Sequence, residues 1–444
     1  MSIWDYRRNF AYDEPLDPGD ERLVALNEAR GDYSSKRLLR KLGIDVVHDT
    51  LRDPPAGACI VFGGHRGCGK STELRALAAE LRGSERFHVV QIDALQALDI
   101  NNLSYADVAL ALAEALAESI AQAGIEVPQV YVTPLHEWSR QVSHQISRSS
   151  SVDGALASGA EVKTGLPLVG SLFARLTTAI RSNSTWKTEI REQVRNSFTD
   201  LAHRFNQLLS FVESELREQG RARALIFVVD GTDRLRGDEA EAFFIRDIHQ
   251  LRQLRANSIY CAPITILDEQ GAVGQNFDAI VRLPMLKLAD KGSAKGNEIA
   301  WQRLREFVYK RLPAENFDHE TTLDALIAHS GGHPRDLLRL VNLCFQEIDE
   351  GPITQAMAAT AARRLSNEYR RLVQPTDYRL LADIDRGPPA HTPATIETRR
   401  LLYDLVLLDC NSYWWQTHPA VQALEGYRSA AAAGGAGADG PPAR

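Results

Sequence analysis

The segment from Gly64 to Ser71 has the residue types and the spacing of a loop that binds phosphate groups. It reads Gly-His-Arg-Gly-Cys-Gly-Lys-Ser, which fits the pattern GxxxxGK[ST] at every fixed position. Glycines let backbone N–H groups wrap around a phosphate, and the start of the following helix adds the positive end of its dipole. Lys70 can neutralise phosphate oxygens, and the Ser71 hydroxyl can bind Mg²⁺. The segment predicts a site for ATP or GTP with magnesium.

We expect the whole loop and the residue after it to contact the nucleotide. These residues are Gly64, His65, Arg66, Gly67, Cys68, Gly69, Lys70, Ser71 and Thr72. Cys68 carries a thiol that could act in redox chemistry, but a small residue that fits a tight loop is the simpler interpretation.

A carboxylate stands at the end of a second apolar run. The run Leu225 to Val229 is followed by Asp230. Because a hard cation such as Mg²⁺ prefers carboxylate and hydroxyl oxygens, we predict that Ser71 and Asp230 hold the metal.

The position after Asp230 is Gly231, where many P-loop proteins that hydrolyse nucleotides have a glutamate that orients the attacking water. Asp233 is the nearest carboxylate that could replace it. We predict that Asp233 positions water or contacts a second magnesium, and the alternative is that it caps the helix that follows. Without a better base, hydrolysis should be slow.

A turn far downstream opens a helix that has an arginine in its first turn. Pro334 fixes the start of this helix, and Arg335 follows it. From there Arg335 could reach the γ-phosphate across a domain cleft; the alternative is an ordinary surface arginine on a capped helix. His333 and His418 also fall in turns, and we interpret both as ordinary turn histidines rather than phosphate ligands.

An α/β domain with a parallel sheet must position these motifs. Five apolar runs predict its buried strands: Ala58–Phe62, Phe87–Ile92, Leu225–Val229, Ser258–Ile266 and Ala279–Leu283. Helical spacing between them, as in Tyr105–Ala123 and Ala240–Arg255, predicts helices that cover the sheet. Residues 126–220 interrupt this alternation and are typical of a helical insertion.

The C-terminal part of the chain is predicted to be mainly helical. A lid begins near Gly296, and a helix followed by the strand-like stretch Asn411–Trp415 predicts a winged helix. The last residues are too poor in apolar side chains to fold. The predicted domains are an N-terminal segment (1–50), a P-loop NTPase domain (51–290) with its insertion (126–220), a helical lid (291–373), a winged-helix domain (374–427) and a disordered tail (428–444).

Three stretches together resemble one group of proteins. GGHRGCGKST, LIFVVDGTDRL and SGGHPRDLLRL look like motifs of the AAA+ and STAND branches of P-loop ATPases, most closely of bacterial KAP-like, ExeA-like and origin-recognition-type ATPases. The resemblance covers about residues 30–350. It implies a five-stranded sheet in the order 5-1-4-3-2, a lid with Arg335 as its nucleotide sensor, and often a winged helix after the lid. A second sensor would be a polar residue on the fourth strand, for which Thr265 and Pro263 are the candidates.

The bulk composition limits the class of protein. The chain has 444 residues, 44% of them apolar, and a formal net charge of −7 at pH 7. This length is typical of two or three domains, and no apolar run approaches the length needed to span a membrane. The N-terminus lacks the pattern of a signal peptide and five scattered cysteines form no CxxC pair, so we expect a reducing, cytoplasmic location.

The motifs favour an ATP-dependent switch, in which slow ATP hydrolysis is coupled to lid closure and to self-association or a protein partner, in a regulatory or defence-related role. Lys70, Asp233 and Arg335 would act in catalysis. The alternative is a DNA-binding ATPase of the origin-recognition type, with Arg399 and Arg400 facing DNA, although the acidic charge disfavours it. A small-molecule kinase is a third class, but it would have no use for the Arg335 turn or a winged helix.

Overall fold

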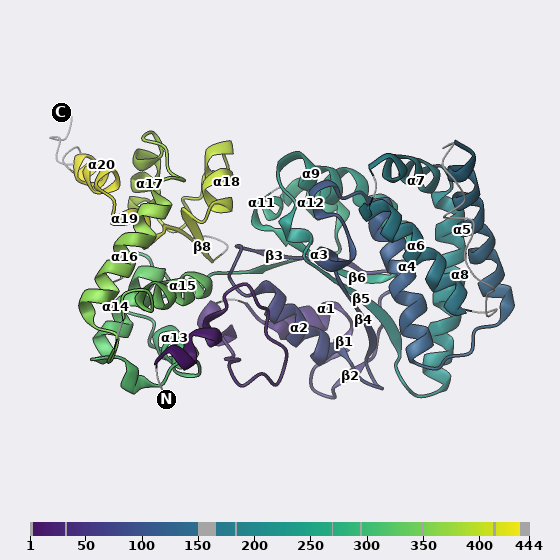
Figure 1. Ribbon diagram of the computed structural model, residues 1–444, viewed down its shortest axis with the longest axis horizontal. Helices are drawn as coiled ribbons and strands as arrows, with labels where there is room; N and C mark the ends of the chain where they lie inside the picture. The colour runs from purple at the N-terminus through teal and green to yellow at the C-terminus, as the bar shows by residue number, and fades with distance from the viewer. Residues whose placement is uncertain are drawn as a thin grey trace, which may run out of the picture. The chain divides into compact units, whose positions relative to one another are not determined.

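The structure is a computed structural model, and it describes residues 3–31, 33–149, 166–182, 184–268, 270–293, 295–348, 350–411 and 414–435. The chain forms two compact units, both drawn in Figure 1, and each unit gathers segments that are far apart in the sequence. Unit 1 consists of Met1–Ser34, Gly63–Arg75 and Arg282–Arg444, and unit 2 consists of Ser35–Phe62 and Ala76–Val281. The phosphate loop therefore belongs to unit 1, and Asp230 belongs to unit 2.

Unit 2 is built on a five-stranded parallel sheet. The strands are β3 (Cys59–Gly64), β4 (Phe87–Asp93), β5 (Ala224–Asp230), β6 (Asn257–Pro263) and β7 (Ala279–Leu283), and they lie in the order β4-β5-β6-β3-β7. Counted along the chain as strands 1 to 5, this is 5-1-4-3-2 read from the opposite edge, so the predicted order is confirmed. Strands β3 and β6 are buried at every residue, as expected for central strands whose two faces are both covered.

A helical bundle beside the sheet contains the predicted insertion. Its helices are α4 (Tyr105–Gln122), α5 (Gln129–Ser149), α6 (Leu166–Ser182), α7 (Ser184–Asn196) and α8 (Phe198–Glu218), which stand together in Figure 1. Helix α6 packs against α4 and α5, and the buried side chains of the bundle join those of the sheet in one apolar core. The helical insertion is thus confirmed, while its glycine-rich part, residues 150–165, lies outside the described residues.

Two predicted elements of unit 2 differ from the structure. The helix expected over Ala240–Arg255 is divided into α9 (Gly237–Glu241), the π-helical η5 (Ala242–Asp247), α10 (Ile248–Leu251) and η6 (Arg252–Leu254). The strand expected to reach Ile266 stops at Pro263, and Thr265 lies in α11 (Ile264–Leu267). The strand prediction is wrong there because the run stays apolar across the junction, whereas Pro263 is the N-cap of the next helix.

Unit 1 is helical apart from one hairpin. Helix α2 (Lys70–Leu81) begins in it, and its later helices are α13 (Glu298–Tyr309), α14 (Glu320–Ser330), α15 (Pro334–Cys344), α16 (Gln355–Tyr369), α17 (Asp377–Arg386), α18 (Ile396–Tyr403), α19 (Pro419–Gln422) and α20 (Glu425–Gly435). Strand β8 (Leu407–Asn411) pairs antiparallel with β9 (Trp414–Thr417). The strand-like stretch Asn411–Trp415, predicted to form a wing, falls on this hairpin: Asn411 ends β8, Trp414 and Trp415 begin β9, and residues 412–413 lie outside the described residues.

The remaining helices and strands are short. They are η1 (Ile3–Phe10), η2 (Asn27–Arg30), α1 (Ser35–Lys41), β1 (Ile44–Asp45), β2 (Thr50–Leu51), α3 (Ala94–Ala97), η3 (Ile100–Asn102), η4 (Thr232–Arg234), α12 (Gln270–Asn276) and η7 (Ala314–Asn316). Helix α20 extends into the segment for which disorder was expected, because alanine has the highest helix propensity, and residues 436–444 lie outside the described residues. Among the described helices, none is long and apolar enough to cross a membrane.

Candidate functional site

The phosphate loop joins β3 to α2, and its backbone requires glycine at two positions. Gly67 (φ 82°) and Gly69 (φ 100°) both have left-handed conformations. A Cβ atom on Gly67 would lie 2.8 Å from Cβ of Arg335 and 2.8 Å from Nε2 of His333. The loop is therefore in direct contact with the start of the lid helix α15, and a side chain at position 67 would force the two apart.

Lys70 bonds to the backbone of its own loop. Its Nζ donates to the carbonyl oxygens of Gly64 (3.0 Å) and His65 (2.9 Å), and the side chain is buried. This places the ammonium group beside the loop amides that would bind a phosphate.

The side chain of His65 is held by the C-terminal hairpin. Its Nδ1 donates to the carbonyl of Leu402 (3.1 Å), and its Nε2 accepts from the amide of Asp409 (2.7 Å). Burial, together with the positive charges of Lys70 and Arg282, holds the pKa of His65 well below its usual 6.5, so the ring is neutral. Both ring nitrogens of His65 thus bond to the backbone of α18 and β8, so only the backbone of His65 could contact a nucleotide.

The N-terminal segment packs on the first turn of α2. The amide of Leu16 donates to Oγ1 of Thr72 (3.2 Å), and Glu73 accepts hydrogen bonds from Asn27 (3.0 Å) and Tyr33 (2.9 Å). These contacts could not be predicted from the sequence, because a polar segment without periodicity shows no preferred partner. Ser71 lies beside them and is partly exposed.

Arg335 is not an ordinary surface residue. Its side chain is 16% exposed, its Nη2 pairs with Oδ1 of Asp13 (3.0 Å), and its Nε donates to the carbonyl of Tyr12 (3.3 Å). Since its Cβ also borders Gly67, Arg335 links the lid, the phosphate loop and the N-terminal segment within unit 1. Pro334 occupies the first position of α15, as predicted.

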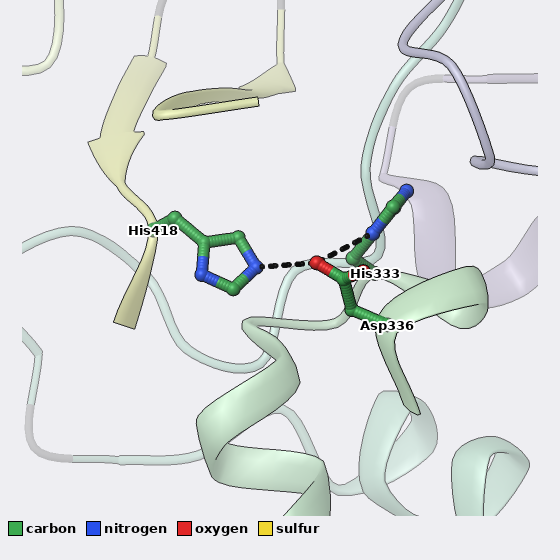
Figure 2. A group of neighbouring side chains, drawn as sticks. All are labelled: His333, Asp336 and His418. Carbon is green, nitrogen blue, oxygen red and sulfur yellow. Dashed lines mark ion pairs between the residues drawn. The ribbon is translucent and has the colours of Figure 1, made fainter. Parts of the chain in front are cut away.

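A buried cluster joins the lid helix α15 to the residue after β9. Figure 2 shows its members, His333, Asp336 and His418, all fully buried. Oδ2 of Asp336 lies 3.2 Å from Nδ1 of His333 and 3.2 Å from Nε2 of His418. The same carboxylate accepts from the Tyr369 hydroxyl (2.6 Å) and from Arg339 (2.7 Å). Both histidines lie in turns before helices, as predicted, but burial and a shared carboxylate set them apart from ordinary turn residues. The spacing of His333 and Asp336 across a helix start was the available signal.

The cluster has the residue types of a metal site, but the hydrogen bond that His418 accepts does not suit a metal ligand. Nδ1 of His418 accepts from the amide of Ala420 (3.1 Å), so the ring proton is on Nε2, the atom that faces Asp336. A metal-bound histidine has the reverse arrangement, in which the second nitrogen donates. On the other side, Nε2 of His333 donates to the carbonyl of Arg66 (2.9 Å). The cluster thus connects the phosphate loop to the end of the hairpin.

In unit 2, carboxylates gather where β4 and β5 end. Asp93 and Asp230 are the last residues of these strands and are paired in register. The side-chain ligand atoms of Asp230, Asp233 and Cys261 all lie within 4.8 Å of one another. The structure therefore brings the two predicted carboxylates together, while the N-cap position of the next helix, α9, is occupied by Arg236.

The backbone at Gly231 explains the missing glutamate. Gly231 has φ 84°, and a Cβ atom there would lie 2.9 Å from Cγ of Leu95. A glutamate at this position would strain the turn after β5. Any carboxylate that orients water must then come from a nearby residue, such as Asp233.

Known proteins share parts of this architecture. Residues 40–246 match the KAP family P-loop domain, and this range contains the phosphate loop, Asp230 and Asp233. No curated protein matches the chain. Among solved structures, a Walker-type ATPase of Pyrococcus abyssi is 13% identical, with 92% of this chain and 98% of that chain covered and a TM-score of 0.41. Cdc6p of Pyrobaculum aerophilum is 12% identical, with 93% and 99% covered and a TM-score of 0.34. The chain has the P-loop NTPase fold, and its resemblance to KAP-type P-loop ATPases, predicted from three motifs, is confirmed over residues 40–246.

Proposed function

We propose that this chain is a switch-type ATPase, which binds ATP with Mg²⁺, hydrolyses it slowly and changes the lid and the C-terminal hairpin according to the bound nucleotide. The proposal is carried by the contacts of one loop with two other parts of unit 1: Gly67 borders Arg335, and His65 is bound by Asp409. A phosphate that moves the loop backbone must alter both contacts. The altered surface would then be recognised by a second copy of the chain or by another protein.

Each predicted site residue has a role in this proposal. Lys70 and the loop amides bind the β- and γ-phosphates, and Arg335 reports whether the γ-phosphate is present. Ser71 and Asp230 supply oxygen ligands of the kind that Mg²⁺ prefers. Asp233 positions the attacking water.

Replacing Arg335 with alanine is expected to weaken ATP binding by about 10-fold and to change ADP binding by less than about 3-fold. A charge-assisted hydrogen bond contributes about 1.5–3 kcal/mol, and only ATP offers the γ-phosphate to this arginine. Calorimetric titration with a slowly hydrolysed ATP analogue and with ADP measures both affinities. Arg379→Ala is the control, because Arg379 is an exposed arginine of the same unit. Equal losses for ATP and ADP would show that Arg335 does not sense the γ-phosphate.

Replacing Asp233 with asparagine is expected to lower the rate of phosphate release by about 10-fold or more, since a positioned base typically contributes at least this factor. ATP affinity should stay within about 3-fold of wild type, because the phosphate contacts come from the loop. Asp238→Asn, at an exposed position of α9, is the matched control. If turnover is the same in both variants, Asp233 does not act on water.

The DNA-binding alternative depends on Arg399 and Arg400, and the structure gives Arg400 a partner within the protein. Nη2 of Arg400 lies 2.7 and 2.8 Å from the two carboxylate oxygens of Asp377, and this ion pair connects α18 to the start of α17. Titration of the protein with duplex DNA at two salt concentrations tests this alternative, because binding through phosphate contacts weakens steeply with salt. Salt-dependent binding at low micromolar protein would favour it over the switch.

A further inference from the structure

Side chains from outside the loop bind two carbonyl groups of the phosphate loop. The carbonyl of Arg66 accepts from His333 (2.9 Å), and the carbonyl of Cys68 accepts from Nη2 of Arg30 (2.6 Å). A peptide group is planar and trans, so its C=O and N–H point in opposite directions. Binding the carbonyl of Cys68 on one side therefore turns the N–H of Gly69 toward the other side. Arg30 thereby helps to set the direction of an amide that GxxxxGK[ST] loops offer to phosphate.

Arg30 lies in an unusual environment for an arginine. It is the last residue of η2, is 2% exposed, and its Nη1 donates to the carbonyl of Pro284 (2.5 Å). Both of these partners are neutral carbonyl groups, and its Nε has no hydrogen-bond partner among the described residues. Within the described part of the chain, no carboxylate forms an ion pair with this guanidinium.

A buried positive charge without a negative partner is costly, and proteins rarely retain one. Carbonyl dipoles compensate part of the charge. Full compensation needs an anion, and the phosphate loop that Arg30 touches is the place where a nucleotide would bring one. The positive charge is also not needed to bind these two carbonyl groups, because a neutral N–H donor can bind a carbonyl as well.

We propose that Arg30 is a nucleotide-binding residue outside the GxxxxGK[ST] segment, which orients the Cys68–Gly69 peptide and whose buried charge is balanced by the phosphates of the bound nucleotide. This inference rests on the proposed nucleotide binding. It differs from the role of Arg335, because the charge of Arg30 acts on the loop itself and so favours ADP and ATP alike.

Two variants separate the charge of Arg30 from its hydrogen bonds. Arg30→Gln and Arg30→Lys both lose the fork that bridges Cys68 and Pro284, but only Arg30→Lys keeps the charge. We expect Arg30→Gln to weaken both ATP and ADP by about 10-fold and Arg30→Lys to stay within about 3-fold of wild type, in calorimetric titrations at one salt concentration. Without nucleotide, Arg30→Gln should melt no lower than Arg30→Lys, because it removes an uncompensated charge.

Each other outcome overturns a defined part of the inference. Equal losses in the two variants would mean that Arg30 only orients the peptide, and wild-type affinities in both would remove it from the site. A glutamine variant that fails to fold while the lysine variant folds would show that the charge serves folding rather than binding. If the wild-type protein itself binds no nucleotide, the proposed function fails, which is a different result from wild-type binding that is unaffected by either variant.

Discussion

Replacing Lys70 with alanine is expected to weaken ATP binding by about 100-fold while the free protein stays folded. The ammonium is the charged group of the loop that would meet the phosphate oxygens, and contacts of this kind contribute about 1.5–3 kcal/mol. In the nucleotide-free loop, Lys70 donates to two backbone carbonyls of its own loop, and water can reach part of that loop. Calorimetric titration with ATP, beside a melting curve of the free protein, measures both effects.

Lys295→Ala is a suitable control for this experiment, because Lys295 is an exposed lysine of the same unit. It should bind ATP as the wild-type protein does. If Lys70→Ala also binds ATP with wild-type affinity and has an unchanged melting curve, the segment Gly64–Ser71 is not the nucleotide site.

Replacing Asp336 with alanine is expected to have the largest effect on stability, a loss of about 3–5 kcal/mol in the free energy of unfolding. The variant leaves Arg339, Tyr369 and two buried histidines without their common acceptor. For a unit of this size, the melting temperature should fall by about 10 °C. Asp383→Ala is the matched control, because Asp383 makes only an exposed ion pair with Arg386, and it should change stability by less than about 0.5 kcal/mol.

The same variant carries a pH signature. Burial alone raises the pKa of Asp336, but the imidazoles of His333 and His418 that face its carboxylate outweigh burial, and the pKa lies well below the usual 3.8. A carboxyl group whose pKa is lower in the folded state stabilises the protein above its unfolded pKa and loses this effect as the pH falls. The difference between wild type and Asp336→Ala should thus be complete near neutral pH and shrink below about pH 4. A difference independent of pH would contradict an ionised Asp336.

The fold could be predicted where a pattern is local. Apolar runs such as Ala279–Leu283 mark buried strands, and the strand order followed from the resemblance that three short motifs carry. The prediction fails where one pattern fits two structures. Residues 257–267 are almost continuously apolar, and only the geometry at Pro263 turns the last part into helix. Likewise, an alanine-rich end is compatible with disorder and with the helix α20.

The candidate site was predictable to a similar degree. The loop, Asp230 and Arg335 belong to recognisable motifs, and the structure places Arg335 against Gly67. Arg30, in contrast, stands in a short turn with no motif, and only the folded chain brings it to Cys68. Long-range contacts between polar side chains leave no periodic trace, so the sequence assigns the N-terminal segment no partner.

The composition of unit 1 has a consequence for how the protein is made. His65 and the amide of Asp409 that binds it are 344 residues apart. A ribosome adds about 5–20 residues per second, so about 20–70 s pass between the synthesis of His65 and that of Asp409. Unit 2 is complete by residue 281, so it can fold while the rest of unit 1 is still being translated. A fragment that stops before Leu402 would contain the entire GxxxxGK[ST] sequence, yet the imidazole of His65 would have neither of its two partners.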